Sequence, residues 1–450
     1  MKDMTKGSPA KLILAFAIPI LIGSLLQKTY SIADTRIVGT YLGDRALAAV
    51  GATTVLSSLF NGFFTGIANG FSIMTAQKFG AKDKKGVKTS FAGALLLGMI
   101  LAVVLVGITL LCMNPILHFM KVPEEFYQDA SGYIRIVIAG MLITMIYDVL
   151  LASARAIGDS VTPLLTLTLS VLLNILGDII LLGYFHTGVW GAAAATVLAQ
   201  AITSVICAIY MLQKYDIFRL VPADFRECSG AMMRSMLATG LSMGFMNSLI
   251  GIGSLILQTA VNGLGASYIV AQSVARKITE VLMAVFVAVG NTMAVYCGQN
   301  YGAEKYSRIR KGIHAGYMIT CSWCIVVLLI VYTSAALLVQ LITGSEDPIM
   351  IDAATKYLRF DSILYVLVAV IFVLRNSLQG IGDRITPLVS SGIEMAGKVI
   401  LTYTLVPAFL YDGVIWVEPI VWIVMILPLI RSMREWNRRI DRKIRLGKEK

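Results

Sequence analysis

Long apolar runs alternate with short polar connections along the whole chain. A membrane-spanning helix needs about 20 mostly apolar residues, and the sequence contains twelve such runs. They lie near residues 12–38, 46–76, 90–113, 131–154, 162–185, 190–212, 236–261, 268–297, 313–342, 357–381, 386–410 and 414–432. The pattern predicts an all-α integral membrane protein with twelve transmembrane helices.

The composition excludes other classes of protein. Of 450 residues, 57% are hydrophobic and 14% are charged, with a mean hydropathy of +0.78. A soluble domain has about 45–50% apolar and about 25% charged residues, so a soluble enzyme is excluded, and disordered chains are richer in charge. The three histidines are scattered, and the C-x-x-C pair Cys321 and Cys324 lies in an apolar run without a second pair, so no metal or redox centre is predicted.

The basic residues follow the topology. The net charge is +12, and most Lys and Arg lie in the N-terminus, in alternate connections and in the tail after residue 431. By the positive-inside rule this predicts a multi-pass protein of the inner (cytoplasmic) membrane with both termini cytoplasmic. We expect the first apolar run to be a retained helix and not a signal peptide. The net charge therefore indicates topology and not a nucleic-acid partner.

Two loop motifs occur twice. Segment 156–164 (AIGDSVTPL) corresponds to 380–388 (GIGDRITPL) at an offset of 224, and 77–81 (QKFGA) corresponds to 299–303 (QNYGA) at an offset of 222. Because each half contains an even number of spans, the halves enter the membrane in the same orientation, as in parallel-repeat transporters. We predict an N-terminal lobe (1–222) and a C-terminal lobe with the basic tail (223–450). A pseudo-twofold axis would relate the lobes. Substrate would bind in a central cleft between them and be transported by alternating access.

The chain resembles the multidrug and toxic compound extrusion (MATE) transporters. The residues that carry this resemblance are the two repeated loops, Ile18-Pro19, Ala33-Asp34-Thr35, Val38-Gly39 and the run from Leu42-Gly43 to Val50-Gly51. The resemblance implies a cation-coupled antiporter that exports organic cations and drugs from an inner membrane. It implies Na⁺ or H⁺ as the coupling ion and no cofactor, and the wider superfamily includes flippases for lipid-linked sugars.

Four polar residues lie at a similar depth in the predicted N-terminal lobe. With a rise of about 1.5 Å per residue, Asp34, Asn174, Asp178 and Thr196 fall in the outer half of their spans. Ionisable residues inside a membrane are costly and indicate function. Their oxygens suit Na⁺, and two close carboxylates would share a proton. The resemblance assigns the family's cation site to the same four positions, whereas the alternative is a hydrogen-bond network that only joins three helices.

Pro19 interrupts the backbone hydrogen bonds of the first span and permits a bend. It matches the helix-1 proline whose bending, by the resemblance, expels substrate. The alternative is a purely structural kink.

The C-terminal lobe contains further intramembrane charges. Glu394 and Lys398 have the i,i+4 spacing of a salt bridge, or they bind substrate or a proton. Glu280 lies beside Arg276 and Lys277 and has the same two alternatives. Asp148 is expected near the cytoplasmic end of its span, paired with the nearby Arg155 or closing an inner gate.

The repeat places different residues at the predicted cation site of the C-terminal lobe. It aligns Lys398 with Asn174 and Thr402 with Asp178, so that site has no copy there. Residues 241–262 and 362–374 also lack the acidic groups through which some family members couple.

These observations predict a Na⁺- or H⁺-coupled exporter, active as a monomer, whose partners are small organic cations and membrane lipid. A flippase for a lipid-linked saccharide is the alternative, and it would need more intramembrane cations than Lys28, Arg36 and Lys398. A membrane enzyme would need a cluster of His, Cys or carboxylate groups that the sequence lacks.

Overall fold

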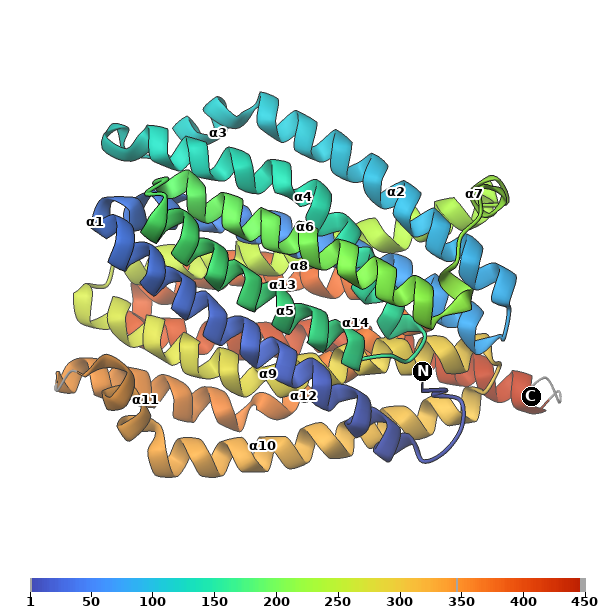
Figure 1. Ribbon diagram of the computed structural model, residues 1–450. Helices are drawn as coiled ribbons and strands as arrows, with labels where there is room; N and C mark the ends of the chain where they lie inside the picture. The colour runs from blue at the N-terminus through green and yellow to red at the C-terminus, as the bar shows by residue number, and fades with distance from the viewer. Residues whose placement is uncertain (1, 345–346, 446–450) are drawn as a thin grey trace. The chain divides into compact units, whose positions relative to one another are not determined.

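The structure is a computed structural model that describes residues 2–344 and 347–445, and the described part is helical (Figure 1). Its elements are α1 (Pro9–Gly80), α2 (Lys84–Leu111), α3 (Met113–Phe119), η1 (Glu124–Phe126), α4 (Tyr127–Ala156), α5 (Val161–Asp178), η2 (Ile179–Tyr184), α6 (Val189–Lys214), η3 (Asp216–Phe218), α7 (Pro222–Arg226), α8 (Gly230–Asn262), α9 (Ala266–Gly302), α10 (Tyr306–Thr343), α11 (Pro348–Ile363), α12 (Tyr365–Gly380), α13 (Ile385–Phe409) and α14 (Tyr411–Arg445).

The described helices account for the twelve predicted spans. Nine of them are long and apolar enough to cross a membrane, and the bent pair α11 and α12 makes a tenth span. Helix α1 is interrupted at Gly43, whose φ of 77° is not helical, so it contains the first two predicted spans. The remaining predicted span, 386–410, corresponds to α13, which contains the buried charged residues Glu394 and Lys398. The predicted all-α membrane fold is confirmed.

The tenth predicted span differs from the expectation of one helix over 357–381. The chain bends by 54° between α11 and α12. At the bend the N–H of Leu364 donates to the carbonyl of Asp361 at 3.0 Å, three residues back, so the α-helical ladder tightens locally and changes direction. Arg375, which lies within the predicted span, is a buried residue of α12.

The chain folds into two compact units. The first unit comprises Met1–Asp3 and Ile22–Phe245, and the second comprises Met4–Leu21 and Met246–Lys450. Helices α1 and α8 each contribute to both units. The division into an N-terminal lobe (1–222) and a C-terminal lobe (223–450) that act as functional halves remains a prediction.

Each unit has its own apolar core. In the first unit α4 lies beside α2 and α6 (Figure 1), and Phe64, Phe71, Phe91 and Met145 are buried among them. In the second unit α9 packs on α10 and α12, and α13 on α14. Its largest buried side chains include Tyr296, Tyr357, Tyr365 and Phe286.

Glycines allow α1 and α8 to approach closely within the first unit. A Cβ on Gly66 would lie 2.6 Å from the carbonyl oxygen of Met243, and a Cβ on Gly70 would lie 2.6 Å from the Cα of Gly240. The spacing of four residues, also found between Gly240 and Gly244, is the small-residue pattern of packed membrane helices. Larger side chains here would separate the helices.

The first loop motif ends a helix in the same way in both halves. Helix α1 ends at Gly80 and α9 at Gly302, and the next helices begin at Lys84 and Tyr306. Two residues after each helix end the chain adopts left-handed torsions, at Lys82 (φ 58°) and Glu304 (φ 57°). The repeat inferred from the sequence is therefore also a repeat of backbone conformation.

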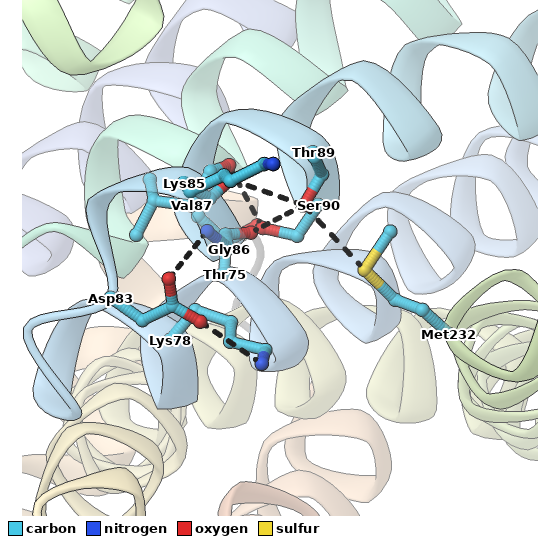
Figure 2. Close-up of polar contacts among 9 residues, drawn as sticks. All are labelled: Thr75, Lys78, Asp83, Lys85, Gly86, Val87, Thr89, Ser90 and Met232. Atoms are coloured by element: carbon cyan, nitrogen blue, oxygen red, sulfur yellow. Dashed lines mark hydrogen bonds and ion pairs between the residues drawn. The ribbon is translucent and has the colours of Figure 1, made fainter. Parts of the chain in front are cut away.

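Figure 2 shows the first of these connections, between α1 and α2. Asp83 caps α2 by accepting from the backbone N–H of Gly86 at 2.8 Å, and it binds Lys78 at 3.2 Å. The hydrogen bond from Gly86 lowers the pKa of Asp83, burial opposes it, and Lys78 lowers the pKa further. A hydrogen bond of 3.1 Å between Thr75 and Ser90 joins the two helices. An open pocket of about 470 Å³ lies alongside, and its charges are paired as Lys78–Asp83 and Lys85–Glu227.

The second loop motif starts a helix in both halves. Gly158 (φ 84°) and Gly382 (φ 93°) adopt left-handed torsions that favour glycine. Asp159 Oδ1 then accepts from the first two N–H groups of α5, each at 3.0 Å, and Asp383 Oδ1 accepts from those of α13 at 3.1 and 3.0 Å. The aspartates satisfy N–H groups that have no partner within the helix, so this motif positions α5 and α13.

Candidate cation site

The structure brings together the four predicted residues of the N-terminal half, from three helices of the first unit. Asp34 projects from α1, Asn174 and Asp178 from α5, and Thr196 from α6. Asp178 is fully buried, Asn174 is 3% exposed, and the other two are half-buried. The long sequence separations explain why only depth and not contact could be predicted.

Asn174 is the centre of the hydrogen-bond network. With its nitrogen turned toward Asp178, it donates to Asp178 Oδ2 at 3.1 Å. Its oxygen then accepts from Thr196 Oγ1 at 3.1 Å and from the Thr196 backbone N–H at 2.9 Å. The Tyr30 hydroxyl hydrogen-bonds the same amide. Asn174 therefore joins α1, α5 and α6 at one point.

The two carboxyl groups lie close enough to interact. Asp34 and Asp178 interact with each other, and Tyr30 lies near enough to interact with both. Tyr133 of α4 is near enough to interact electrostatically with both carboxylates. Oδ1 of Asp178 is buried and has no hydrogen-bond partner of good geometry among the described residues. Two adjacent carboxylates with a free oxygen can hold a cation or share a proton.

The backbone is irregular directly after Asp178. Residues Ile179–Tyr184 form a π-helical turn (η2) that continues α5. Such π-helical turns are rare in proteins as a whole, but those that occur are frequently found at functional sites.

Tyr30 is a member of this site that sequence reasoning missed. Its position one turn before Asp34 on the same helix face was the available signal. Tyr133 lies on α4, and no motif marked it.

In the second unit, Glu394 and Lys398 belong to a buried charge network. Lys398 Nζ lies 3.2 Å from Glu394 Oε1 and 3.1 Å from Glu418 Oε1. Arg375 approaches Glu394 Oε2 at 3.4 Å. Sequence reasoning missed Glu418 and Arg375, because each lies on a different helix from Glu394 and Lys398.

Asp361 is a third carboxylate near this network. It is 1% exposed, and both of its oxygens are without a hydrogen bond of good geometry in the described residues. It lies one residue before the segment 362–374 in which acidic residues were sought. Glu280, in contrast, is exposed on α9 and is not a buried member of the network.

The described residues contain no group of three His, Cys, Asp or Glu side chains that could hold a metal ion. Cys321 and Cys324 are free thiols.

The sequence matches the family described as MatE twice, over residues 19–180 and over residues 242–404. Together these ranges cover well over half of the chain. The protein belongs to the MATE family of membrane transporters. The two matches begin 223 residues apart and end 224 apart, so each half of this MATE chain corresponds to one copy of the family repeat.

Several relatives and solved structures are similar to this MATE chain over most of its length. The sequence is 25% identical over 399 residues to the "Probable multidrug resistance protein YoeA" of Bacillus subtilis, with 86% of each chain covered. It is 24% identical over 431 residues to the multidrug export protein MepA of Staphylococcus saprophyticus, covering 95% of this chain and 93% of the relative. An outward-facing structure of a multidrug resistance MATE family transporter matches at a TM-score of 0.87 and 24% identity, covering 97% and 99% of the two chains.

The helix-1 proline of this MATE protein lies within an unbroken helical segment. Helix α1 continues through Pro19, and its non-helical torsions occur at Gly43. Pro19 has no N–H to donate to the carbonyl four residues earlier, and it lies two residues before α1 passes from the second unit to the first. Arg36 is exposed, two residues beyond Asp34.

Asp148 and Arg155 are each bound to α1 in the first unit of the MATE chain. Asp148 Oδ2 accepts from Thr65 Oγ1 at 2.8 Å, and Arg155 donates to Asn69 Oδ1 at 3.1 Å. The two contacts are about one turn apart on α1 and about two turns apart on α4, so two polar contacts in succession join these helices.

Proposed function

We propose that this MATE protein is a multidrug efflux transporter that exports small organic cations across the cytoplasmic membrane in exchange for Na⁺ or H⁺. The observation that supports this proposal most directly is the pair Asp34 and Asp178, with a buried free oxygen on Asp178. The multidrug export named for the relatives supports the substrate class.

In the proposed mechanism Asp34 and Asp178 bind the coupling cation together. Two close carboxylates in an apolar surrounding repel each other unless a proton or a metal cation lies between them. When a cation binds, rotation of the Asn174 amide would turn its oxygen toward the carboxylates, and with Thr196 Oγ1 it would complete a set of hard donors of the kind that Na⁺ prefers. Tyr30 and Asn174 would hold the carboxylates in place, because both contact residues on more than one helix.

Release of the cation would alter the packing of α1, since Asp34 and Tyr30 both lie on this helix. Pro19 lowers the cost of bending α1 because one backbone hydrogen bond is already absent there. We infer that cation exchange at Asp34 and a bend at Pro19 are two parts of the same alternating-access step. The binding of a ligand shifts such an equilibrium only by its different affinity for the two states.

The proposed orientation has both termini in the cytoplasm and a monomer as the functional form. Within the first unit, Lys78, Lys85 and Lys214 gather near the helix ends that we assign to the cytoplasm, and Glu125 and Asp129 near the opposite ends. This distribution supports the orientation by the positive-inside rule.

The flippase alternative is less well supported. It would require free intramembrane cations for a pyrophosphate group, but Lys398 and Arg375 are held by Glu394 and Glu418.

The test is efflux of a fluorescent organic cation such as ethidium from proteoliposomes that contain the purified protein. A Na⁺ gradient and a pH gradient are imposed separately. We expect one of the two to drive ethidium transport, and the driving gradient identifies the coupling ion. Transport driven by neither gradient, together with transbilayer movement of a lipid-linked saccharide, would favour the flippase.

A further inference from the structure

Lys398 occupies, in the second unit, the repeat position of Asn174. The two residues are 224 positions apart, as are the first residues of their helices, Val161 of α5 and Ile385 of α13. Both are 3% exposed. One turn later, Asp178 (0% exposed) corresponds to Thr402 (1% exposed). The two helices therefore bury the same positions but with different chemistry.

The Lys398 ammonium is surrounded by oxygen atoms from three helices. It lies 3.2 Å from Glu394 Oε1 on its own helix and 3.1 Å from Glu418 Oε1 on α14. It also donates to Ser254 Oγ on α8 at 3.5 Å. This is the surrounding that a small monovalent cation would need, and the ammonium already fills it.

The neighbouring backbone accommodates the lysine stem. A Cβ on Gly253 would lie only 3.1 Å from Lys398 Cδ, closer than most such contacts. Gly253 therefore leaves room for the methylene chain to pass along α8 to the carboxylates.

Lys398 is the cation that Glu394 and Glu418 share. Arg375 binds Glu394 at 3.4 Å, and Arg276 interacts electrostatically with Glu418. Asp361 interacts with Glu418 and Lys398. Loss of the Lys398 ammonium would remove the nearest cation from both Glu394 and Glu418 and leave their buried charges less compensated. Such uncompensated charges are strongly unfavourable.

We propose that the Lys398 ammonium is a tethered cation that permanently fills, in the second repeat, the place that the coupling cation takes transiently in the first. Without this ammonium, Glu394, Glu418 and Ser254 form a site for a small monovalent cation such as methylammonium. The comparison with the first repeat rests on the proposed function. Its consequence is that the transporter has one exchangeable cation site of this type per cycle and not two.

The experiment measures thermal unfolding of the purified full chain in detergent, in an Asp34→Asn/Asp178→Asn background that removes the acidic groups of the first site. Lys398→Ala is added to this background, and methylammonium chloride is titrated against choline chloride at constant ionic strength. We expect Lys398→Ala to lower the unfolding midpoint and methylammonium to raise it again in a saturable way. The background protein with Lys398 intact should not respond, and adding Glu418→Gln should abolish the response.

A Lys398→Ala protein that shows no saturable response contradicts the proposal, as does an equal response in the presence of Lys398 or of Glu418→Gln. If Lys398→Ala is unfolded in choline, it is purified in methylammonium, and failure to fold there is equally contradictory. Because the readout is stability and the background lacks Asp34 and Asp178, these outcomes are independent of whether the first site couples transport.

Discussion

The amide nitrogen of Asn174 lies 3.1 Å from a carboxylate oxygen of Asp178, one turn further along α5. The other oxygen of Asp178 is buried and without a hydrogen-bond partner of good geometry in the described part of the chain, and Asp34 lies near enough to interact with this carboxylate. A buried carboxylate with an open oxygen is unfavourable unless a proton or a cation occupies it.

Tyr30→Phe should weaken cation binding without abolishing it. The substitution removes the hydroxyl that contacts the Asn174 amide and Asp34, a hydrogen bond worth about 0.5–1.5 kcal/mol net. We expect a roughly 2- to 10-fold higher half-saturating concentration of the coupling cation in proteoliposome efflux. Tyr184→Phe, at a residue that is 79% exposed, is the matched control. An unchanged half-saturating concentration in Tyr30→Phe would exclude Tyr30 from the site.

Asp159→Asn should destabilise the protein in a pH-dependent manner. Burial alone would raise the pKa of Asp159, but hydrogen bonds from Thr162 and Tyr215 and the charge of Lys214 outweigh it and lower the pKa. A carboxylate with a lowered pKa stabilises the folded state above its unfolded pKa of about 4, and this stabilisation is lost as the pH falls through the folded value.

The unfolding midpoint in detergent, measured from pH 7 down to pH 3, tests this. At pH 7 we expect Asp159→Asn to cost about 1.5–3 kcal/mol, the value of hydrogen bonds to a charged group. The difference from the wild type should narrow below about pH 4. Asp216→Asn, whose side chain is 86% exposed, controls for general charge effects, and a pH-independent difference would show that the Asp159 charge does not contribute.

Gly70→Ala should destabilise the packing of α1 on α8. The new Cβ would lie 2.6 Å from the Cα of Gly240, so the helices must separate. Overpacking of this kind costs about 1–3 kcal/mol. Gly51→Ala, on the same helix with no atom within 4 Å of the new Cβ, should be neutral or slightly stabilising because alanine favours helix. Equal unfolding midpoints for both variants would contradict the close contact.

Labelling of a native thiol tests the orientation. Cys112 is exposed after the last residue of α2, at the end that we assign to the outside. A membrane-impermeant maleimide should label Cys112 in intact cells, and Cys112→Ser should remove the labelling. Cys207, Cys297 and Cys324 are buried and should not react. Labelling only after the cells are permeabilised would place this end in the cytoplasm.

The sequence predicted the features that depend on local pattern. Apolar length revealed the spans, and the repeated loops around Asp159 and Asp383 revealed the duplication, because each loop starts a helix with its own glycine and its own aspartate side chain. Depth along the helices was enough to place Asp34, Asn174, Asp178 and Thr196 at one level.

Features that depend on contacts between distant segments could not be predicted. Arg375 of α12 contacts Glu394 of α13, and neither sequence spacing nor a motif marks this pair. Glu418 joins Lys398 only because α14 packs on α13. Tyr30 needed the structure because a tyrosine in an apolar helix is common, and only its contact with Asn174 distinguishes it.

The most direct test of the account is gradient-driven ethidium efflux by Asp178→Asn in proteoliposomes, compared with the wild type and with Asp216→Asn. We expect Asp178→Asn to abolish efflux driven by the coupling ion while the protein keeps its monodisperse elution and its binding of ethidium. Efflux by Asp178→Asn at the wild-type rate, under the same gradient, would contradict the assignment of the coupling cation to Asp34 and Asp178.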